Sequence, residues 1–442
     1  MREKGSRVAA TYWKAQRGTA PHQIDRRPGQ VGGGPLVAGG IGPFPNLIKK
    51  YGYPVEVHTL TTPDGYILEM HRIPHGRNKN NVDINKTVVV LMHGLLGSSS
   101  VWVLMGPGAG LGYILADEGY DVWMGNFRGN TYSRRHKSLN PDAILNTAYW
   151  KFSWDEMGIL DLPSMIDYVL QATNKDRLHY IGHSQGTTAF FVMGSLRPDY
   201  NEKIISMHAL TPVAYMAHNT DPFLLIFLIF TWASEALCKD KVVTQSICSN
   251  ILFLIGGWDE AQLNKTMMPT IFGHLPAGSS VRQLVHYAQG ISSKQFRRYD
   301  YGSLWANWIV YGSLDPPNYD LSRITAPVFL HYGDNDPLAD INDVDRLFNE
   351  LGRPIGKYRV PLALFTHLDF IFAINAKELV YDRVINQIAA MDPAYYFAQY
   401  RRSSVVNSSL RSRNSEQEVL SFLNLLQKFT VAPTLQVTTF GK

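Results

Sequence analysis

One serine lies in a pattern that could make it a nucleophile. Ser184 stands between Gly182 and Gly186 in the run Gly-His-Ser-Gln-Gly. The apolar stretch 178–181 precedes this run, and the small residues 187–189 follow it. A strand that turns sharply into a helix at such a run projects the serine hydroxyl above a sheet. The beginning of the helix also favours negative charge that develops there. An ordinary turn that caps a helix is the alternative.

A serine hydroxyl is a weak nucleophile unless a base takes its proton, and that base is most often a histidine held by a carboxylate. Around this kind of turn the acid and the histidine follow the serine in chain order. His367 precedes the last expected helix and is the predicted base. Three aspartates, Asp334, Asp336 and Asp340, follow the apolar run 328–332, and spacing alone leaves all three open as the acid. Each of them, taken singly, could equally be a turn or capping carboxylate.

Acyl transfer at a serine also requires backbone N–H groups that bind the oxyanion. Gln185, directly after the serine, is the first predicted donor. Leu95 is the second, because the run His-Gly-Leu-Leu-Gly that contains it directly follows the apolar stretch 87–92. An ordinary glycine turn at a strand end is the alternative there. His93 is expected to order this loop, whereas His183 is not a candidate base, because its position beside the serine points its ring away.

The chain around these residues alternates short apolar runs with stretches of helical spacing. Predicted buried strands cover 87–92, 120–124, 178–181, 204–210 and 328–332. A hairpin is expected over 55–60 and 66–73, and helices are expected over 111–118 and 161–173, with Pro163 in the first turn of the second helix. Strands that alternate with helices predict a mostly parallel sheet with helices on both faces. Together with the serine turn and the order of acid and histidine, this predicts an α/β-hydrolase fold.

The stretch 212–320 interrupts this alternation. It contains the apolar run 223–230, both cysteines and several helix-like pieces. An insertion of this kind is expected to form a mainly helical cap over the strand ends. The expected organisation is therefore a flexible, basic and glycine-rich arm at 1–43, a core at 44–211 and 321–392, the cap at 212–320, and a C-terminal extension of unassigned role at 393–442.

The composition excludes several classes of protein. The 442 residues carry a formal net charge of +5, and residues 1–34 alone hold seven Lys or Arg against two acidic residues, so the rest is close to neutral. A nearly neutral body offers no basic surface for nucleic acid. The sequence has no glycine-rich phosphate loop and no cluster with metal-ligand spacing, so no cofactor and no metal are expected. The run 223–230 is too short for a transmembrane segment, and the first thirty residues lack the apolar region of a signal peptide.

Two cysteines and three sequons are informative about the cellular compartment of the protein. Cys238 and Cys248 lie ten residues apart and lack further partners for a zinc site, so they form either one small-loop disulfide or two reduced thiols. Asn85, Asn264 and Asn407 stand in Asn-x-Ser/Thr triplets and are candidate glycosylation sites, which favours a secretory route.

These residues, together with further motifs, resemble the acid lipase family, which includes gastric and lysosomal acid lipases and many insect lipases. The matching motifs extend over residues 45 to about 392. Besides the serine run they are Tyr51-Gly52-Tyr53-Pro54, Asp64-Gly65-Tyr66-Ile67-Leu68, His93-Gly94-Leu95-Leu96, Gly125-Asn126-Phe127-Arg128-Gly129-Asn130, Phe152-Ser153-Trp154-Asp155-Glu156, Asn335-Asp336-x-Leu338-Ala339-Asp340 and His367-Leu368-Asp369-Phe370. The arm and the C-terminal extension lie outside the family pattern, and the signal peptide usual in the family is not visible.

The resemblance implies roles that spacing leaves open. It assigns the acid to Asp336, two positions before the motif Leu-Ala-Asp, and it supports Leu95 and Gln185 as oxyanion donors. It implies a mobile lid in the cap whose run 223–230 could meet a lipid surface, with a plain core helix as the alternative. It also implies a disulfide between the two cysteines of the cap.

The same resemblance implies the substrates, which are neutral lipid esters of the triacylglycerol or sterol ester class, cleaved in lipid catabolism by a secreted or lysosomal enzyme. Two other functions stay open: an esterase for small soluble esters, and a catalytically inactive lipid-binding protein on the same scaffold. Inactive proteins of that kind commonly lose triad members, whereas Ser184, Asp336 and His367 are all present. The sequence therefore favours an active lipase.

Overall fold

The computed structural model describes residues 44–77, 86–143, 147–219, 259 and 261–392. The predicted arm and the C-terminal extension lie outside these residues, as do the apolar run 223–230, Cys238 and Cys248.

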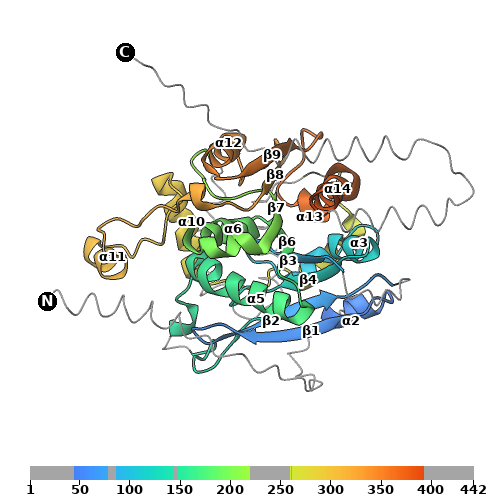
Figure 1. The fold of residues 1–442 in the computed structure, drawn as a ribbon, viewed down its shortest axis with the longest axis horizontal. Helices are drawn as coiled ribbons and strands as arrows, with labels where there is room; N and C mark the ends of the chain where they lie inside the picture. Colours follow the sequence, from blue (N-terminus) through green and yellow to red (C-terminus); the bar gives the residue numbers. More distant parts are fainter. Residues whose placement is uncertain (1–43, 78–85, 144–146, 220–258, 260, 393–442) are drawn as a thin grey trace, which may run out of the picture. The chain divides into compact units, whose positions relative to one another are not determined.

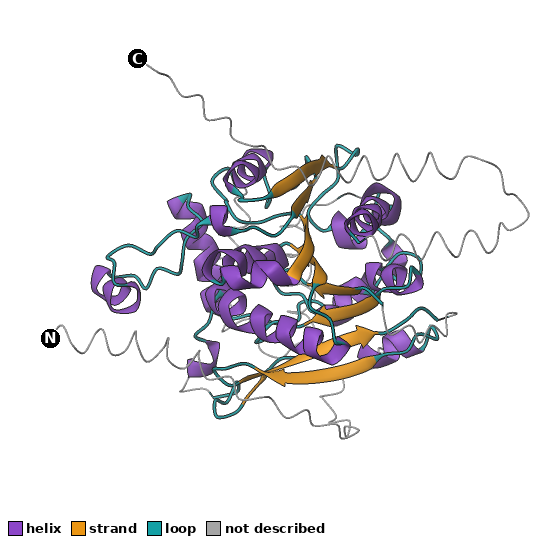
Figure 2. Cartoon of the chain, viewed as in Figure 1, coloured by secondary structure: helices purple, strands orange, loops and turns teal. Residues whose placement is uncertain are grey.

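The described residues form a nine-stranded sheet in which the order along the main path is β1-β2-β4-β3-β6-β7-β8-β9, with β5 paired to β2. The strands are β1 (Glu56–Thr61), β2 (Tyr66–Ile73), β3 (Val88–Met92), β4 (Asp121–Gly125), β5 (Arg135–His136), β6 (Leu178–His183), β7 (Ile204–Leu210), β8 (Val328–Tyr332) and β9 (Pro354–Arg359). From β4 to β9 all neighbours are parallel, whereas β2 is antiparallel to β1, β4 and β5. Figure 2 shows the strands as one layer with helices on either side.

Helices cover both faces of this sheet. The described helices are α2 (Phe44–Lys49), α3 (Leu111–Asp117), α4 (Trp154–Glu156), α5 (Leu162–Thr173), α6 (Gln185–Leu196), α9 (Met268–His274), α10 (Val281–Ser293), α11 (Leu304–Tyr311), α12 (Ile341–Glu350), α13 (Asp369–Phe372) and α14 (Asp382–Met391). In Figure 1, α5, α6 and α12 lie on one side of the strands, and α3 and α14 lie on the other. The prediction of a mostly parallel sheet covered on both faces is confirmed.

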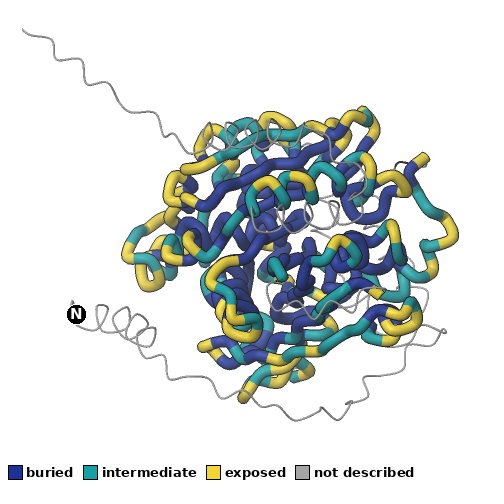
Figure 3. Tube along the Cα trace, turned by 45° about the vertical axis from the view of Figure 1, so that its right-hand side comes forward, coloured by how far each residue is buried: buried dark blue, intermediate teal, exposed yellow. Residues whose placement is uncertain are grey.

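The central strands are buried because their sequences are almost wholly apolar. Every residue of β3, β4, β6 and β8 is buried. Figure 3 shows that the buried residues gather in the interior. Parallel strands flanked by helices on both faces require continuous apolar runs rather than alternating ones. Among the described helices, none is both long and apolar enough to cross a membrane.

The helix predicted over 161–173 begins earlier in the structure. A π-helical turn, Met157–Asp161, joins α4 to α5 and places Pro163 inside a longer helical stretch. Proline has no N–H, so the carbonyl of Ile159 receives no α-helical hydrogen bond from residue 163. An Arg197 guanidinium donates to that carbonyl instead, at 3.4 Å. Pro163 nevertheless stands in the first turn of α5, as predicted, and the Arg197 side chain supplies a donor to the carbonyl that lacks one.

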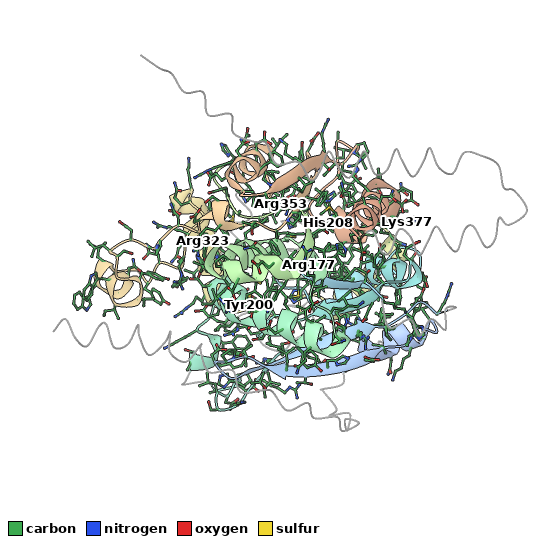
Figure 4. All side chains as sticks on the ribbon, viewed as in Figure 1. Arg177, Tyr200, His208, Arg323, Arg353 and Lys377 are labelled. Carbon is green, nitrogen blue, oxygen red and sulfur yellow. The ribbon has the colours of Figure 1, made fainter. Side chains whose placement is uncertain are left out.

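Three histidines of the sheet interior have no catalytic contact. His179 of β6 shares the Ser206 hydroxyl with His208 of β7, and His208 stacks beside His331 of β8. Figure 4 labels His208 between the strands and α14. Burial lowers the pKa of all three rings, that of His179 to about 3. They are neutral packing residues.

Candidate active site

Ser184 occupies the turn between β6 and α6 with φ 52° and ψ −118°. A positive φ at a residue other than glycine costs about 1–3 kcal/mol and persists only where the surroundings enforce it. The surroundings do so here: Ser184 N–H donates to the Leu210 carbonyl at 3.0 Å, and the Ser184 carbonyl accepts from Thr187 N–H at 2.8 Å. The nucleophile candidate is thus held at the end of the central strand.

Glycines around the turn allow three segments to meet. A Cβ on Gly182 would lie 2.8 Å from the carbonyl carbon of Gly186, and a Cβ on Gly186 would lie 2.4 Å from the Met92 carbonyl oxygen. A Cβ on Gly94 would lie 3.0 Å from the Ser184 Cβ. The end of β3 and the loop after it therefore pack directly against the serine, as the glycine pattern predicts.

Asp336 and His367 lie together. His367 Nδ1 is 2.9 Å and 3.0 Å from the two carboxylate oxygens of Asp336, and both side chains are buried. Asp336 Oδ1 also accepts from the N–H groups of Leu338 at 2.9 Å and Ala339 at 3.0 Å. Because an ionised carboxylate only accepts, the imidazole proton sits on Nδ1 and Nε2 keeps a lone pair. Nε2 is buried and makes no hydrogen bond within the described chain, which leaves it ready to take a proton.

The structure separates the three aspartates that spacing could not. Asp334 accepts from Arg359 Nε at 2.7 Å, and Arg359 is exposed. Asp340 caps α12 by accepting from Asn342 N–H at 2.8 Å. Of the three, only Asp336 contacts His367.

Two side chains that the sequence left without a catalytic role fix the loop of His367. Asp369 accepts from Thr366 N–H at 2.7 Å and from the Thr366 hydroxyl at 2.8 Å. His183 Nε2 donates to the His367 carbonyl at 3.0 Å, so its ring is directed to the backbone of the other histidine. Burial lowers the pKa of His183 to about 3, which keeps it neutral. Only the spacing of Thr366 and Asp369, three residues apart as in a helix cap, could have indicated the first contact.

The predicted oxyanion donors flank the serine. Gln185 is the first residue of α6, and Leu95 lies in the loop after β3. No hydrogen bond within the described chain uses either backbone N–H. The Gln185 side chain donates to Gln283 of α10, which links the stretch 261–320 to the residue beside Ser184.

His93 sets the direction of the Leu95 N–H. Its Nε2 accepts from Phe127 N–H at 3.2 Å, so the ring proton is on Nδ1, and Nδ1 donates to the Gly94 carbonyl at 2.8 Å. The C=O and N–H of a trans peptide point in opposite directions. Holding the Gly94 carbonyl therefore aims the Leu95 N–H the other way. Burial lowers the pKa of His93 to about 4, so the ring keeps this single tautomer.

Asn264, one of the three sequon residues, is partly exposed and accepts from Thr266 N–H at 3.1 Å. Asn85 and Asn407 lie outside the described residues, as do both cysteines.

Known proteins match over the same region. A model described as a partial alpha/beta-hydrolase lipase region covers residues 44–106, and one described as the alpha/beta hydrolase fold covers residues 87–372. Lipase 1 of Drosophila melanogaster is 43% identical over 353 residues, with 77% of this chain and 78% of that protein covered. Gastric triacylglycerol lipase of Bos taurus is 38% identical over 362 residues, covering 78% and 90%. Lysosomal acid lipase/cholesteryl ester hydrolase of Homo sapiens is 36% identical over 360 residues, covering 77% and 89%.

The sheet order, the serine turn after β6 and the His–Asp pair after β8 agree with these matches. The chain is a member of the acid lipase family of α/β-hydrolases.

Proposed function

We propose that this protein is a lipase that hydrolyses neutral lipid esters, of the triacylglycerol or sterol ester class, with Ser184 as nucleophile, His367 as base and Asp336 as the acid. The observation that carries this proposal is the buried His367–Asp336 pair, joined at 2.9 Å and with Nε2 unpaired within the described chain. Relatives named for triacylglycerol and for cholesteryl ester support the substrate class.

The proposed reaction proceeds through an acyl-enzyme. Ser184 Oγ attacks the ester carbonyl carbon while His367 Nε2 takes its proton, and the Leu95 and Gln185 N–H groups bind the oxyanion. His367 then returns the proton to the leaving alkoxide, and the alcohol departs. A water molecule attacks the acyl-enzyme with His367 again as base, which releases the fatty acid and restores Ser184. Asp336 stays ionised throughout and stabilises the imidazolium.

Several finer features belong to the same proposal. We assign residues 44–211 and 321–392 to the core and residues 212–320 to a cap. Within the cap, we assign the apolar run 223–230 to a lid that meets the lipid–water interface. The contact between Gln283 and Gln185 supports a cap above the nucleophile. The proposal includes a disulfide between Cys238 and Cys248, glycans at the three sequons, and a secreted or lysosomal location. The relatives' gastric and lysosomal names support the location.

Substitution of the nucleophile tests the assignment. Ser184→Ala should abolish hydrolysis of p-nitrophenyl butyrate and labelling by a fluorophosphonate probe. Ser195→Ala is the matched control, because Ser195 is a buried serine of the same helix whose hydroxyl makes no hydrogen bond within the described chain. Activity that survives in Ser184→Ala, or is lost equally in Ser195→Ala, would refute the proposal.

The substrate class is tested separately. Trioleoylglycerol and cholesteryl oleate emulsions should be hydrolysed, with a rate that rises when the substrate exceeds its solubility. A protein that cleaves only dissolved p-nitrophenyl esters would be an esterase for small esters. A protein that takes no fluorophosphonate label would be an inactive lipid-binding relative.

A further inference from the structure

Helix α11 exposes almost all of its large apolar side chains. The exposed fractions are 61% for Leu304, 67% for Trp305, 46% for Trp308, 59% for Ile309 and 47% for Val310. In Figure 1, α11 lies out beyond α10 and is connected to the rest of the chain by two long loops. A helix of a water-soluble domain normally buries its apolar stripe, so this helix has the opposite arrangement.

A polar residue attaches α11 to the protein. Asn307 is 2% exposed, and its amide donates to Asp300 Oδ1 at 3.0 Å and to the Leu314 carbonyl at 3.1 Å while accepting from Tyr301 N–H at 2.9 Å. Ser303 caps the N-terminus by accepting from Ala306 N–H, and Gly312 ends the helix with φ 72°. The two ends of α11 are thus capped, and the hydrogen bonds of Asn307 attach the helix to the protein. None of these contacts uses the apolar side chains of the helix.

Four of these five apolar side chains form a continuous strip. At about 100° per residue, Leu304, Trp305, Trp308 and Ile309 fall within an arc of about 140°. The rings of Trp305 and Trp308 stack with centroids 5.1 Å apart. Residues 302–314 contain no charged side chain, and the cation Arg298 lies over the Tyr311 ring, 4.7 Å from its centroid. Tryptophan beside aliphatic residues on an uncharged face is typical of helices that lie in a membrane interface.

We propose that α11 is an interfacial anchor that inserts this strip into the surface of the lipid aggregate on which the enzyme acts. The inference rests on the proposed function, because that function supplies the lipid surface to which α11 would bind. Area argues against a second copy of the chain, because five side chains on one short helix fall below the about 800 Å² per partner of a specific protein interface. A fluid lipid layer needs no complementary groove to cover a protruding helix.

The position of α11 in the chain supports the same occupant. The helix follows α10, whose Gln283 contacts Gln185 beside the nucleophile. An anchor in this stretch is therefore tied to the segment that must meet the substrate.

Flotation measures the anchoring independently of turnover. The full chain carrying Ser184→Ala is mixed with a trioleoylglycerol emulsion stabilised by phosphatidylcholine and floated on a sucrose gradient, with and without Trp305→Gln plus Trp308→Gln. The α11 substitutions should lower the lipid-bound to free ratio by about tenfold or more. The matched control is Val57→Gln plus Ile341→Gln, two exposed apolar residues on β1 and α12, which should leave the ratio unchanged.

A second readout uses the active protein. With Ser184 intact, the α11 variant should raise the apparent KM for the emulsion while kcat/KM for dissolved p-nitrophenyl butyrate stays within about twofold, because insertion precedes the chemistry. Equal flotation of all variants, equal loss in the control pair, or a dimer that dissociates on substitution of α11 would overturn the anchor. Flotation that depends on α11 in a protein without esterase activity would refute the proposed function and leave the anchor standing.

Discussion

In His367 and His93, two histidines near Ser184, the neighbouring groups determine which ring nitrogen carries the proton. This difference distinguishes the roles of the two rings. His367 gives its Nδ1–H to a carboxylate and keeps Nε2 unpaired within the described chain. His93 uses both nitrogens, one accepting from Phe127 N–H and one donating to the Gly94 carbonyl. Only His367 can therefore act as a base, whereas His93 acts through the loop that it holds.

The role of His93 predicts different outcomes for its two amide replacements. The asparagine amide can place a donor where Nδ1 stands, whereas the glutamine amide reaches the position of Nε2. We expect His93→Gln to lower kcat on p-nitrophenyl butyrate about 10- to 100-fold with little change in KM, because the Leu95 N–H loses its direction. His93→Asn should lose less than about tenfold. Equal losses in both variants would contradict an orienting hydrogen bond.

Asp336→Asn should lower kcat about 10,000-fold, because an amide that donates to His367 imposes the wrong tautomer. The backbone bonds from Leu338 and Ala339 can still be accepted by the amide oxygen, so the loop should keep its shape. Steady-state kinetics on the same ester measures the loss. Asp334→Asn and Asp340→Asn are the controls, and a loss of similar size in either would move the acid role away from Asp336.

Spacing alone could predict Ser184 and His367 but not choose among the three aspartates. All three lie within eight residues after β8, and the choice depends on which carboxylate the irregular turn aims at His367. Asp336 is aimed there because its Oδ1 binds the N–H groups of the two residues that follow Pro337. Such a turn has no periodicity from which a side-chain direction could be read.

At the scale of elements, one buried arginine joins three segments of the core. Arg128, in the loop after β4, donates from Nη1 to Asp64 Oδ2 at 2.6 Å and from Nε to Asp161 Oδ1 at 2.8 Å. Its guanidinium also lies 3.9 Å from the centroid of the Tyr66 ring. The hairpin turn, the β4 loop and the start of α5 are thus held by one charge.

Arg128→Met should destabilise the protein by about 3–5 kcal/mol, because the buried carboxylate of Asp161 loses its partner inside the protein. Urea denaturation at neutral pH measures the free energy of unfolding. Arg134→Met is the matched control, since its ion pair with Asp142 is exposed and should contribute less than about 1 kcal/mol. An Arg128 variant as stable as the Arg134 variant would show that the network does not hold these segments together.

The central parallel strands that the sequence predicted are those with continuous apolar runs. The strands at 204–210 and 328–332 have the predicted bounds, and β3, β4 and β6 differ by one or two residues at their ends. By contrast β9 has no such run: it is the last strand in the sheet order, none of its residues is buried, and it begins at Pro354. An edge strand of this kind obtains its conformation from pairing with β8, which no local pattern reveals.

At the scale of the whole molecule, the solvent exposure of apolar side chains is the property that the sequence predicted least well. The apolar residues of α11 have the composition of a buried helix, and only the structure shows Asn307 as its attached side. Hydrophobicity predicts burial only on average, so an apolar helix that faces outward is informative because it violates the expectation.

Buried histidines make the stability of the whole molecule depend on pH. Burial lowers the pKa of His179 and His183 to about 3, and that of His93 and His286 to about 4. An unfolded chain protonates histidine below about pH 6.5, whereas these folded rings stay neutral. The unfolded state therefore binds more protons below about pH 6.5. Each of these histidines makes the folded state less stable, relative to the unfolded state, as the pH falls from there toward the pKa of its folded form.

We expect the urea concentration at the unfolding midpoint to decrease as the pH is lowered from about 7 to about 5. The change should be steepest just below the histidine pKa of the unfolded chain. Three carboxyls oppose this trend: burial raises the pKa of Asp161 and Asp369 to about 6 and also raises that of Glu156, so their folded forms take up protons first and gain stability on acidification. The buried histidines, which also include His208 and His331, outnumber these three carboxyls. The pKa values of the four histidines named above also depart farther from those of the unfolded chain than do the pKa values of Asp161 and Asp369, so the loss dominates. Urea titrations followed by circular dichroism at several pH values measure the midpoint. A midpoint that is unchanged or higher at about pH 5 would show that the carboxyls dominate, and Asp369→Asn should then remove part of that gain.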